Sequence, residues 1–276
     1  MPAGREWMCS MQAIPTTAAV FDGAAERYDE IFTNSLIGRA QRQVVWEQME
    51  RVFSPGSSLL ELNCGTGEDA FFLARKGMNV VAFDQSPNMI EVAIERRNRG
   101  AVDAVSFSVL DTQNLSRLSP EKKFQGAFSN FGGLNCVSDV PGVAEDLASL
   151  LEPGAPLVLC TLGPSCLWEI CWYALQGKWK KALRRLKGST EARIGSGQPF
   201  EIHYYSTAAL QVMFWPFFRL KFWKGVGIAV PPSYLEPWAA RFPRLLRALI
   251  QLDRWWGSVP GVRGMADHIL LVFERT

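Results

Sequence analysis

A short acidic and glycine-rich run contains residues suited to binding a ligand that carries a ribose. Glu61 and Asn63 precede a turn that holds Gly65 and Gly67, and Asp84 ends a later apolar run. Glycines let a ligand approach the backbone closely, and the first N–H groups of a following helix face that ligand unpaired. A carboxylate such as Asp84 can accept hydrogen bonds from two vicinal ribose hydroxyls. The spacing therefore predicts a nucleotide-type site, although a glycine-rich turn alone is a weak signal.

Further candidate residues follow the ends of the next predicted strands. Met89 offers an apolar cover for a flat ring, and Asp111 could accept a hydrogen bond from an exocyclic amine or merely cap a helix over residues 112–115. Glu61 lies inside the end of the first strand, which is unfavourable for a charge unless it faces a cation or a hydrogen-bonding group. The candidates that follow the later strand ends are Gln85, Met89, Asp111, Thr112 and Asn130.

The elements that must position these residues alternate between strand and helix. Alternation of this kind predicts an α/β fold with a doubly wound parallel sheet and right-handed crossovers. Ligands of such sheets bind outside the carboxyl ends of the strands, where all the candidates fall. Pro153 and Gly154 form a helix-stop turn before the fifth strand. The predicted strands are residues 59–62, 79–83, 105–109, 124–128 and 157–161.

In order and spacing, these residues resemble the class I S-adenosylmethionine-dependent methyltransferases. The resemblance is closest to the small-molecule branch that includes quinone-ring methyltransferases (methyltransferase types 11 and 25). It covers residues 21–161 well and the C-terminal third in outline. It implies a Rossmann-like, mostly parallel seven-stranded sheet with helices on both faces and N-terminal cap helices. It also implies an antiparallel edge formed by residues 219–229 and 268–275, and a helical, aromatic C-terminal lid.

The resemblance also implies roles for the candidate residues. Glu61 and the Gly65–Gly67 turn would hold the methionine part of S-adenosylmethionine, and Asp84 would bind its ribose. Met89 would pack on the adenine. One departure is Asn63, which replaces a glycine of the family pattern, but asparagine tolerates the left-handed backbone. By the same resemblance, Asp111 and Thr112 would meet the adenine edge, Asn130 would lie near the acceptor and Tyr28 would close over the cofactor. The full predicted cofactor set is Tyr28, Glu61, Asn63, Gly65, Gly67, Asp84, Gln85, Met89, Asp111, Thr112 and Asn130.

The predicted organisation is one methyltransferase domain over residues 1–276. Residues 1–18 lack the apolar centre of a signal peptide and are predicted to form a flexible leader, and Met1 and Met11 are both candidate starts. The remaining boundaries are cap helices at 19–55, a cofactor-binding core at 56–162, lid or substrate insertions at 163–206 and 232–262, and a closing helix and strands at 207–231 and 263–276.

Two histidines are the natural candidates for a general base. His203 lies in a predicted strand, and we leave open whether it is a base or an aromatic core neighbour. Tyr204 and Tyr205 are candidates to line an acceptor pocket. His268 opens the last strand, and we expect it to have no chemical role. Because aromatic residues are frequent in the C-terminal region, we predict an apolar or aromatic small-molecule acceptor, with O-methylation favoured over C- or N-methylation.

Two C-terminal segments are both basic and aromatic. Residues 167–187 and 234–256 repeat apolar residues at helical spacing and carry many lysines and arginines. We favour solvated lid helices that cover the active site. The alternative is peripheral contact with anionic lipid headgroups.

Composition narrows the remaining classes. A chain of 276 residues with 48% hydrophobic content can build one large core. Its net charge of +2 gives no drive toward nucleic acid, and its six cysteines show no metal-ligand spacing. No apolar run of about 18 residues occurs. We therefore predict no metal, no nucleic-acid partner and a cytoplasmic protein; the oligomeric state is undetermined. The rival functions are an RNA methyltransferase and a non-catalytic protein that binds S-adenosylmethionine.

Overall fold

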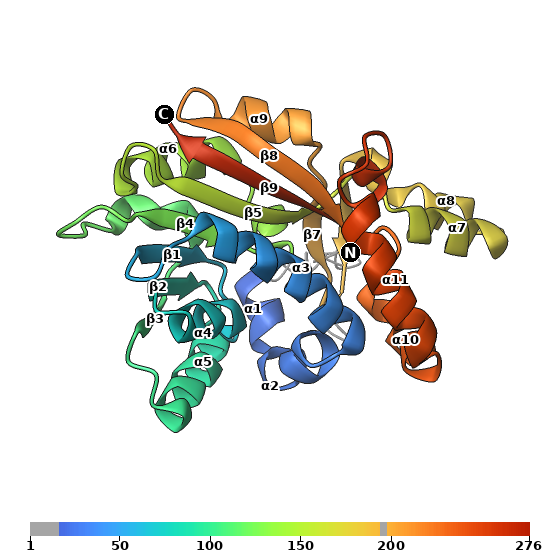
Figure 1. The fold of residues 1–276 in the computed structure, drawn as a ribbon, viewed down its shortest axis with the longest axis horizontal. Coiled ribbons are helices and arrows are strands. Elements are labelled where there is room, and N and C mark those ends of the chain that lie inside the picture. The colour runs from blue at the N-terminus through green and yellow to red at the C-terminus, as the bar shows by residue number, and fades with distance from the viewer. Residues whose placement is uncertain (1–16, 194–197) are drawn as a thin grey trace, which may run out of the picture.

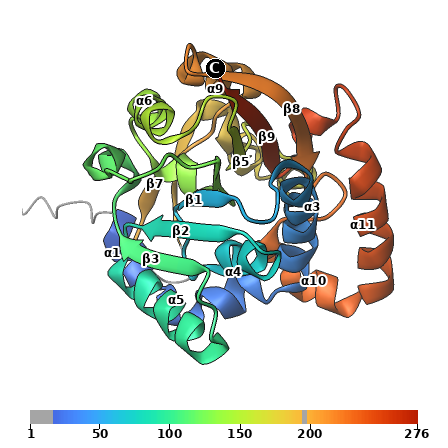
Figure 2. The ribbon, with the colours of Figure 1, turned by 60° about the vertical axis from the view of Figure 1, so that its left-hand side comes forward.

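A seven-stranded sheet with helices on both faces forms the centre of the molecule (Figures 1 and 2). The computed structural model describes residues 17–193 and 198–276. The strand order is β3-β2-β1-β4-β5-β9-β8, in which the first five strands are parallel and β9 is antiparallel to both β5 and β8. The strands are β1 Ser58–Leu62, β2 Asn79–Asp84, β3 Val105–Val109, β4 Gly126–Ser129, β5 Pro156–Leu162, β8 Phe218–Val226 and β9 His268–Arg275. The predicted α/β doubly wound sheet with its antiparallel edge is confirmed.

Helices connect and cover these strands. The predicted leader lies outside the described residues up to position 16, but its last two residues, 17 and 18, already belong to a helix. The α-helices outside the lid are α1 Thr17–Asp22, α2 Ala25–Tyr28, α3 Leu36–Val52, α4 Glu68–Arg75, α5 Pro87–Gly100, α6 Val140–Leu150 and α9 Thr207–Phe214. A π-helix, η1 Asp29–Thr33, follows α2, and 3-10 turns lie at η2 Thr112–Arg117, η3 Gly133–Cys136, η5 Ser233–Leu235 and η6 Arg263–Met265.

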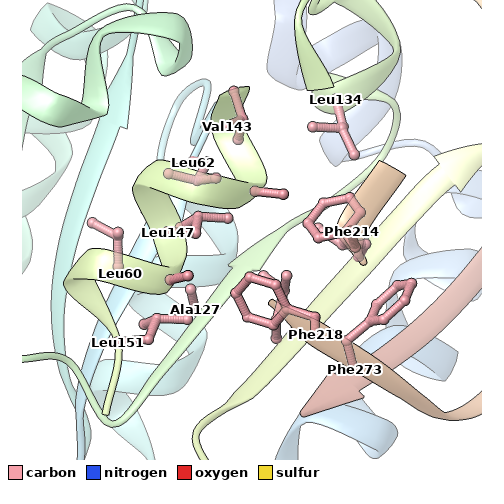
Figure 3. Close-up of a cluster of buried hydrophobic side chains, with 14 of the residues drawn as sticks. Leu60, Leu62, Ala127, Leu134, Val143, Leu147, Leu151, Phe214, Phe218 and Phe273 are labelled. Atoms are coloured by element: carbon pink, nitrogen blue, oxygen red, sulfur yellow. The ribbon is translucent and has the colours of Figure 1, made fainter. Parts of the chain in front are cut away.

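Successive side chains of β1 point to opposite faces of the sheet and so belong to two separate parts of the core. Leu60 and Leu62 point to the face covered by α6 and α9, whereas Leu59 points to the face covered by α3, α4 and α5. Figure 3 shows Leu60 and Leu62 close to side chains of α6 on the first face, with Phe214 and Phe273 in the same cluster. Because both faces are covered, the central parallel strands are mostly apolar, whereas the edge strand β3 exposes Ser106 and Ser108. Polar residues gather after the carboxyl ends of the strands.

A C-terminal lid lies at one end of the sheet, at the right of Figure 1. Its elements are α7 Leu167–Leu175, α8 Trp179–Ala182, the 3-10 turn η4 Arg184–Lys187, β6 Ser189–Ala192, β7 Phe200–His203, α10 Glu236–Arg241 and α11 Pro243–Trp256. Strands β6 and β7 pair antiparallel as a separate small sheet. Within the described residues, 17–193 and 198–276, no helix is long and apolar enough to cross a bilayer.

Two buried or half-buried carboxylates attach α10 and α11 to the body. Asp253 on α11 accepts hydrogen bonds from the backbone N–H groups of residues 227–229 at 2.6–3.0 Å. Glu236 at the start of α10 accepts from the N–H groups of Leu36 and Ile37 at 2.7 and 3.0 Å, and so caps α3. Glu236 therefore fixes α10 to α3, and Asp253 fixes α11 to the residues that follow β8.

Candidate active site

The carboxyl ends of β1 and β2 bring the glycine turn and Asp84 together. Leu62 pairs with Phe83 in parallel register, so the residues that follow the two strands are neighbours. One Asp84 oxygen accepts from Gly65 N–H at 2.8 Å, and the other accepts from Ser86 N–H at 2.9 Å. Burial raises the pKa of Asp84, and these N–H groups oppose the rise. Each carboxylate oxygen has a second lone pair available, which fits a residue predicted to bind ribose hydroxyls.

The turn needs its unusual residues for different reasons. Asn63 has a φ of 55°, which confirms that asparagine here adopts the left-handed conformation. Its Oδ1 accepts from Ser129 Oγ at 3.2 Å, which fixes the turn to the end of β4. Gly67 also has a positive φ, and a Cβ added there would lie 2.6 Å from the Phe107 ring. Gly67 therefore serves the packing under the turn, whereas Gly65 faces the cavity.

Glu61 is buried beneath the turn with an oxygen that has no partner. The side chain is 2% exposed, and its Oε2 makes no hydrogen bond to any described residue. Burial raises the pKa of Glu61 well above its usual value; Asp69 adds to the rise and Arg42 opposes it. A small cavity opens beside it, lined also by Tyr28 and Asn130. An unpaired buried carboxylate oxygen there fits a cationic group, as the methionine end of S-adenosylmethionine would supply.

Arg42 and Asp69 form a buried ion pair next to Glu61 that the sequence did not reveal. Arg42 Nη1 and Asp69 Oδ1 are 2.6 Å apart, and the same oxygen accepts from Trp46 Nε1 at 2.6 Å. Asp69 Oδ2 accepts from Asn130 Nδ2 at 3.1 Å, which orients this amide at the cavity. Since the charges of Arg42 and Asp69 balance, Glu61 is the carboxylate of this group that remains unpaired.

A cavity of about 470 Å³ extends from the glycine turn to the lid. At the cofactor end it is lined by seven of the predicted residues, and at the other end by aromatic and aliphatic side chains with Tyr204. Burial raises the pKa of Tyr28 to about 12, so its phenol stays protonated at neutral pH. The predicted residues that line the cavity are Tyr28, Asn63, Gly65, Asp84, Gln85, Met89, Asn130 and Tyr204.

Other predicted residues do not line this cavity. Asp111 accepts from Gln113 N–H at 2.9 Å and so caps η2, which is the structural alternative left open above. Thr112 is buried beside it. Tyr205 donates its hydroxyl hydrogen bond to Val137 O at 3.1 Å, away from the lining. The His203 ring stacks on Tyr205 with centroids 6.1 Å apart, so the structure places His203 among aromatic neighbours and not in the cavity.

His268, which we expected to have no chemical role, lines the cavity instead. Its ring lies edge-to-face with the Phe131 ring, with the two ring centroids 5.4 Å apart. Nδ1 is buried without a hydrogen-bond partner among the described residues and lies 3.5 Å from Asp267 Oδ2, which leaves Nε2 as the nitrogen accessible from the cavity. Burial lowers the pKa of His268, although Asp267 opposes this, so the imidazole is neutral at neutral pH.

A buried ion network connects the lid to His268. Arg185 on η4 contacts Glu169 on α7 at 3.1 Å and Asp267 at 2.6 Å. Arg184 contacts the same Glu169 at 2.5 Å. Burial alone would raise the pKa of Asp267, but His268 and Arg185 outweigh it and hold this pKa below the usual value. These residues are far apart in the sequence, and the basic run around Arg184 was interpreted as part of solvated lid helices, so the buried acidic partners were not predicted.

Three of the cysteines are protonated thiols and not reactive thiolates. Burial raises the pKa of Cys64 well above its usual value and raises that of Cys136 and Cys160 to about 12. These cysteines therefore remain protonated, as expected for packed side chains. Across the described part of the chain, no group of three or more His, Cys, Asp or Glu is arranged to hold a metal ion.

Comparisons with known proteins agree with this geometry. A family model described as a methyltransferase domain matches residues 53–194. Demethylmenaquinone methyltransferase from Clavibacter sepedonicus is 32% identical over 145 residues, covering 52% of this chain and 56% of the relative. The 2-phytyl-1,4-naphtoquinone methyltransferase from Synechococcus elongatus is 33% identical, covering 53% and 63%. The matches thus span little more than half the length of these curated relatives.

Two further comparisons concern a relative named for a different substrate and a solved structure of similar fold. Phosphoethanolamine N-methyltransferase 1 from Zea mays is 30% identical over 48% of this chain and 26% of its own. In fold, the PH0226 protein from Pyrococcus horikoshii OT3 superposes with a TM-score of 0.57 at 16% identity, covering 90% of this chain and 98% of that one. The family model covers more than half of the sequence and includes the glycine turn and Asp84. The chain therefore belongs to the methyltransferase domain family, as a class I S-adenosylmethionine-dependent member.

Proposed function

We propose that the protein methylates an oxygen atom of a small, apolar or aromatic acceptor, and that His268 removes the acceptor proton. The observation that carries this proposal is one continuous cavity with the cofactor residues at one end and an apolar wall with a neutral imidazole at the other. When bound, S-adenosylmethionine supplies a methyl group on a sulfonium, which is already activated for displacement. The protein must then hold, align and deprotonate the acceptor.

At the cofactor end, we assign binding to the predicted residues that line the cavities. Asp84 would accept the ribose hydroxyls, and Glu61 would provide its unpaired oxygen to the cationic methionine end. Met89 would cover the adenine ring, and Tyr28 would close over the ligand as a neutral phenol. We leave Asp111 and Thr112 out of this proposed set, because neither lines the cavity.

At the acceptor end, the lining favours a flat or apolar molecule. Phe131, Phe200 and Ile202 lie on the cavity wall, where burying apolar surface contributes about 25 cal/mol per Å². The relatives named for quinone substrates support an acceptor of this kind. The relative named for phosphoethanolamine is an N-methyltransferase, so homology alone leaves the acceptor atom open.

His268 supports transfer to oxygen because a hydroxyl acceptor has to lose a proton. A neutral imidazole with an accessible Nε2 can take that proton and hold it, and the Asp267 carboxylate 3.5 Å from Nδ1 favours the resulting imidazolium. Tyr204, whose pKa is raised by burial, remains a hydrogen-bond donor and would orient the acceptor. Of the two roles left open for His203, we favour the aromatic neighbour and assign the base role to His268, because His203 does not line the cavity.

The test uses transfer of a labelled methyl group from S-adenosylmethionine to apolar metabolite extracts. The His268→Asn variant should lose on the order of a hundredfold in kcat, while its calorimetric affinity for S-adenosylmethionine stays unchanged. The His203→Asn variant is the matched control and should keep full turnover. In the wild type, kcat/KM should fall only at a pH below the usual imidazole value of about 6.5, because burial lowers the pKa of His268 and protonation then removes the base. Full activity of His268→Asn would refute the base role, and binding without turnover on any extract would favour a non-catalytic protein.

A further inference from the structure

The outer face of the lid exposes an unusual set of apolar side chains. Leu175 at the end of α7 is 87% exposed, and Trp179 at the start of α8 is 62% exposed. In the sequence, the exposed apolar residues recur three or four positions apart, although Gly177 separates α7 from α8. An exposed stripe of this kind is costly in water and marks an interaction surface. The stripe consists of Trp172, Leu175, Trp179, Leu183 and Leu186.

Positive charge surrounds this stripe and is not neutralised by the ion pairs described for the lid. Residues 170–190 contain no Asp or Glu. Arg184 and Arg185 are paired with Glu169, which is buried on the inner side of α7. The lysines, in contrast, are exposed and have no acidic partner among the described residues; they are Lys178, Lys180, Lys181 and Lys187.

The helix α11 also combines exposed apolar side chains with exposed basic side chains. Its buried side contains Leu246 and Asp253, and its outer side exposes an apolar stripe. Exposed arginines flank that stripe at positions 241, 244 and 247. The stripe consists of Leu245, Leu252, Trp255 and Trp256 on α11, with exposed Phe242 directly before the helix and exposed Val259 after it.

The two stripes belong to one region of the molecule. Tyr173 of α7 stacks on Tyr234 with ring centroids 6.3 Å apart, and Trp168 of α7 lies 5.9 Å from Trp238 of α10. Figure 1 shows α7, α8, α10 and α11 gathered at the same end of the sheet. Tyr234 and Glu169 from this region also line the cavity. The part of the lid that carries the apolar and basic surface therefore also contributes residues to the cavity wall.

We propose that this surface docks the protein on an anionic lipid bilayer. Tryptophan prefers the boundary between headgroups and hydrocarbon, leucine inserts below it, and lysine and arginine meet the anionic headgroups. The exposed lysines and arginines suit anionic headgroups, and the apolar stripes suit the hydrocarbon below them. Both features favour a bilayer over a second protein, because the core of a protein interface would exclude several unpaired lysines. Resting on the proposed function, docking would present the acceptor end of the cavity to apolar molecules dissolved in the membrane.

Flotation with lipid vesicles tests this proposal on the full chain. The wild type should float with vesicles that contain phosphatidylglycerol and much less with vesicles of phosphatidylcholine alone. Each lysine near an anionic surface strengthens partitioning about fivefold, so Lys180→Gln/Lys181→Gln should weaken it about thirtyfold. The matched control Lys122→Gln/Lys123→Gln removes the same charge from an exposed site elsewhere and should bind as the wild type. Raising the ionic strength to about 1 M, where the Debye length is about 3 Å, should also weaken binding.

The apolar part of the surface is tested separately. Leu175→Ser/Trp179→Ser should lose at least tenfold in partitioning, whereas Val109→Ser/Val212→Ser, which changes exposed residues of β3 and α9, should lose little. Absence of vesicle binding by a wild type that still binds S-adenosylmethionine in calorimetry would overturn the docking proposal alone. Light scattering that finds a dimer in the absence of lipid, converted to monomer by Leu175→Ser/Trp179→Ser, would also overturn it, because the surface would then be an interface between copies of the chain.

Discussion

Replacing Glu61 with glutamine should stabilise the ligand-free protein while weakening its affinity for S-adenosylmethionine. Glu61 is almost fully buried, and one of its oxygens has no partner. Burying an ionised carboxylate in such a place is unfavourable, and the raised pKa of Glu61 expresses that cost. Glutamine has nearly the same shape but carries no charge to bury.

The pH dependence gives this prediction its sign. Because the pKa is raised in the folded state, the bound proton contributes stability that is fully present below the unfolded value of 4.5 and is lost as the pH rises through the folded pKa. The wild type therefore loses about 1.4 kcal/mol for each pKa unit of the rise, and Glu61→Gln does not. In a chain of this size, about 1 kcal/mol corresponds to roughly 2–4 °C in Tm.

Thermal unfolding between acidic and mildly alkaline pH measures this difference. The Tm values of the wild type and Glu61→Gln should meet at low pH and diverge by at least about 2–4 °C at high pH, with the variant more stable. Exposed Glu121 provides the control, since Glu121→Gln should show no such divergence. Calorimetry should show weaker binding of S-adenosylmethionine to Glu61→Gln. A variant that is less stable than the wild type at every pH would refute the argument that Glu61 is an unpaired buried carboxylate.

Two other substitutions test the turn. Asp84→Ala should weaken S-adenosylmethionine binding at least tenfold in calorimetry, since charge-assisted hydrogen bonds contribute about 1.5–3 kcal/mol each. The control is Asp139→Ala, which removes a comparable carboxylate from the start of α6. It should lower the free energy of unfolding by about 1 kcal/mol and leave the affinity unchanged. Equal affinities in the Asp84 variant and the wild type would contradict the assignment. Gly67→Ala should lower the free energy of unfolding in urea by at least about 1 kcal/mol more than Gly56→Ala, because both positions have a positive φ but only Gly67 has the Phe107 ring 2.6 Å from the added Cβ. Equal losses would show that the ring moves aside at no cost.

The cofactor end of the site was largely predictable from the sequence. Its residues follow directly after strands with clear apolar runs, so the parallel register brings Asn63 beside Asp84 without further information. Asp111 shows the limit of this reasoning. It also follows a strand, yet whether its side chain turns toward a ligand or caps η2 depends on the local backbone, and here it caps η2.

The acceptor end was not predictable for a physical reason. Glu169, Arg185 and His268 lie about 16 and 83 residues apart in the chain and meet only because the lid folds back on the start of β9. Periodicity describes which side of a helix is apolar, but not which distant carboxylate a buried arginine will meet. The same reasoning left open whether His203 is a base or an aromatic core neighbour, since a histidine amid aromatic residues resembles a pocket residue until the packing is known.

The position of β9 in the sheet has a consequence for the order in which the chain folds during synthesis. β9 lies between β5 and β8, so residues 156–162 and 218–226 have no sheet partner on these edges until residues 268–275 leave the ribosome. Until then β5 presents an apolar, unpaired edge to other nascent chains. His268 is the first residue of that last strand, so the strand that completes the sheet also delivers the imidazole to the cavity. A truncation before His268 would thus expose an aggregation-prone edge and remove the proposed base in one event.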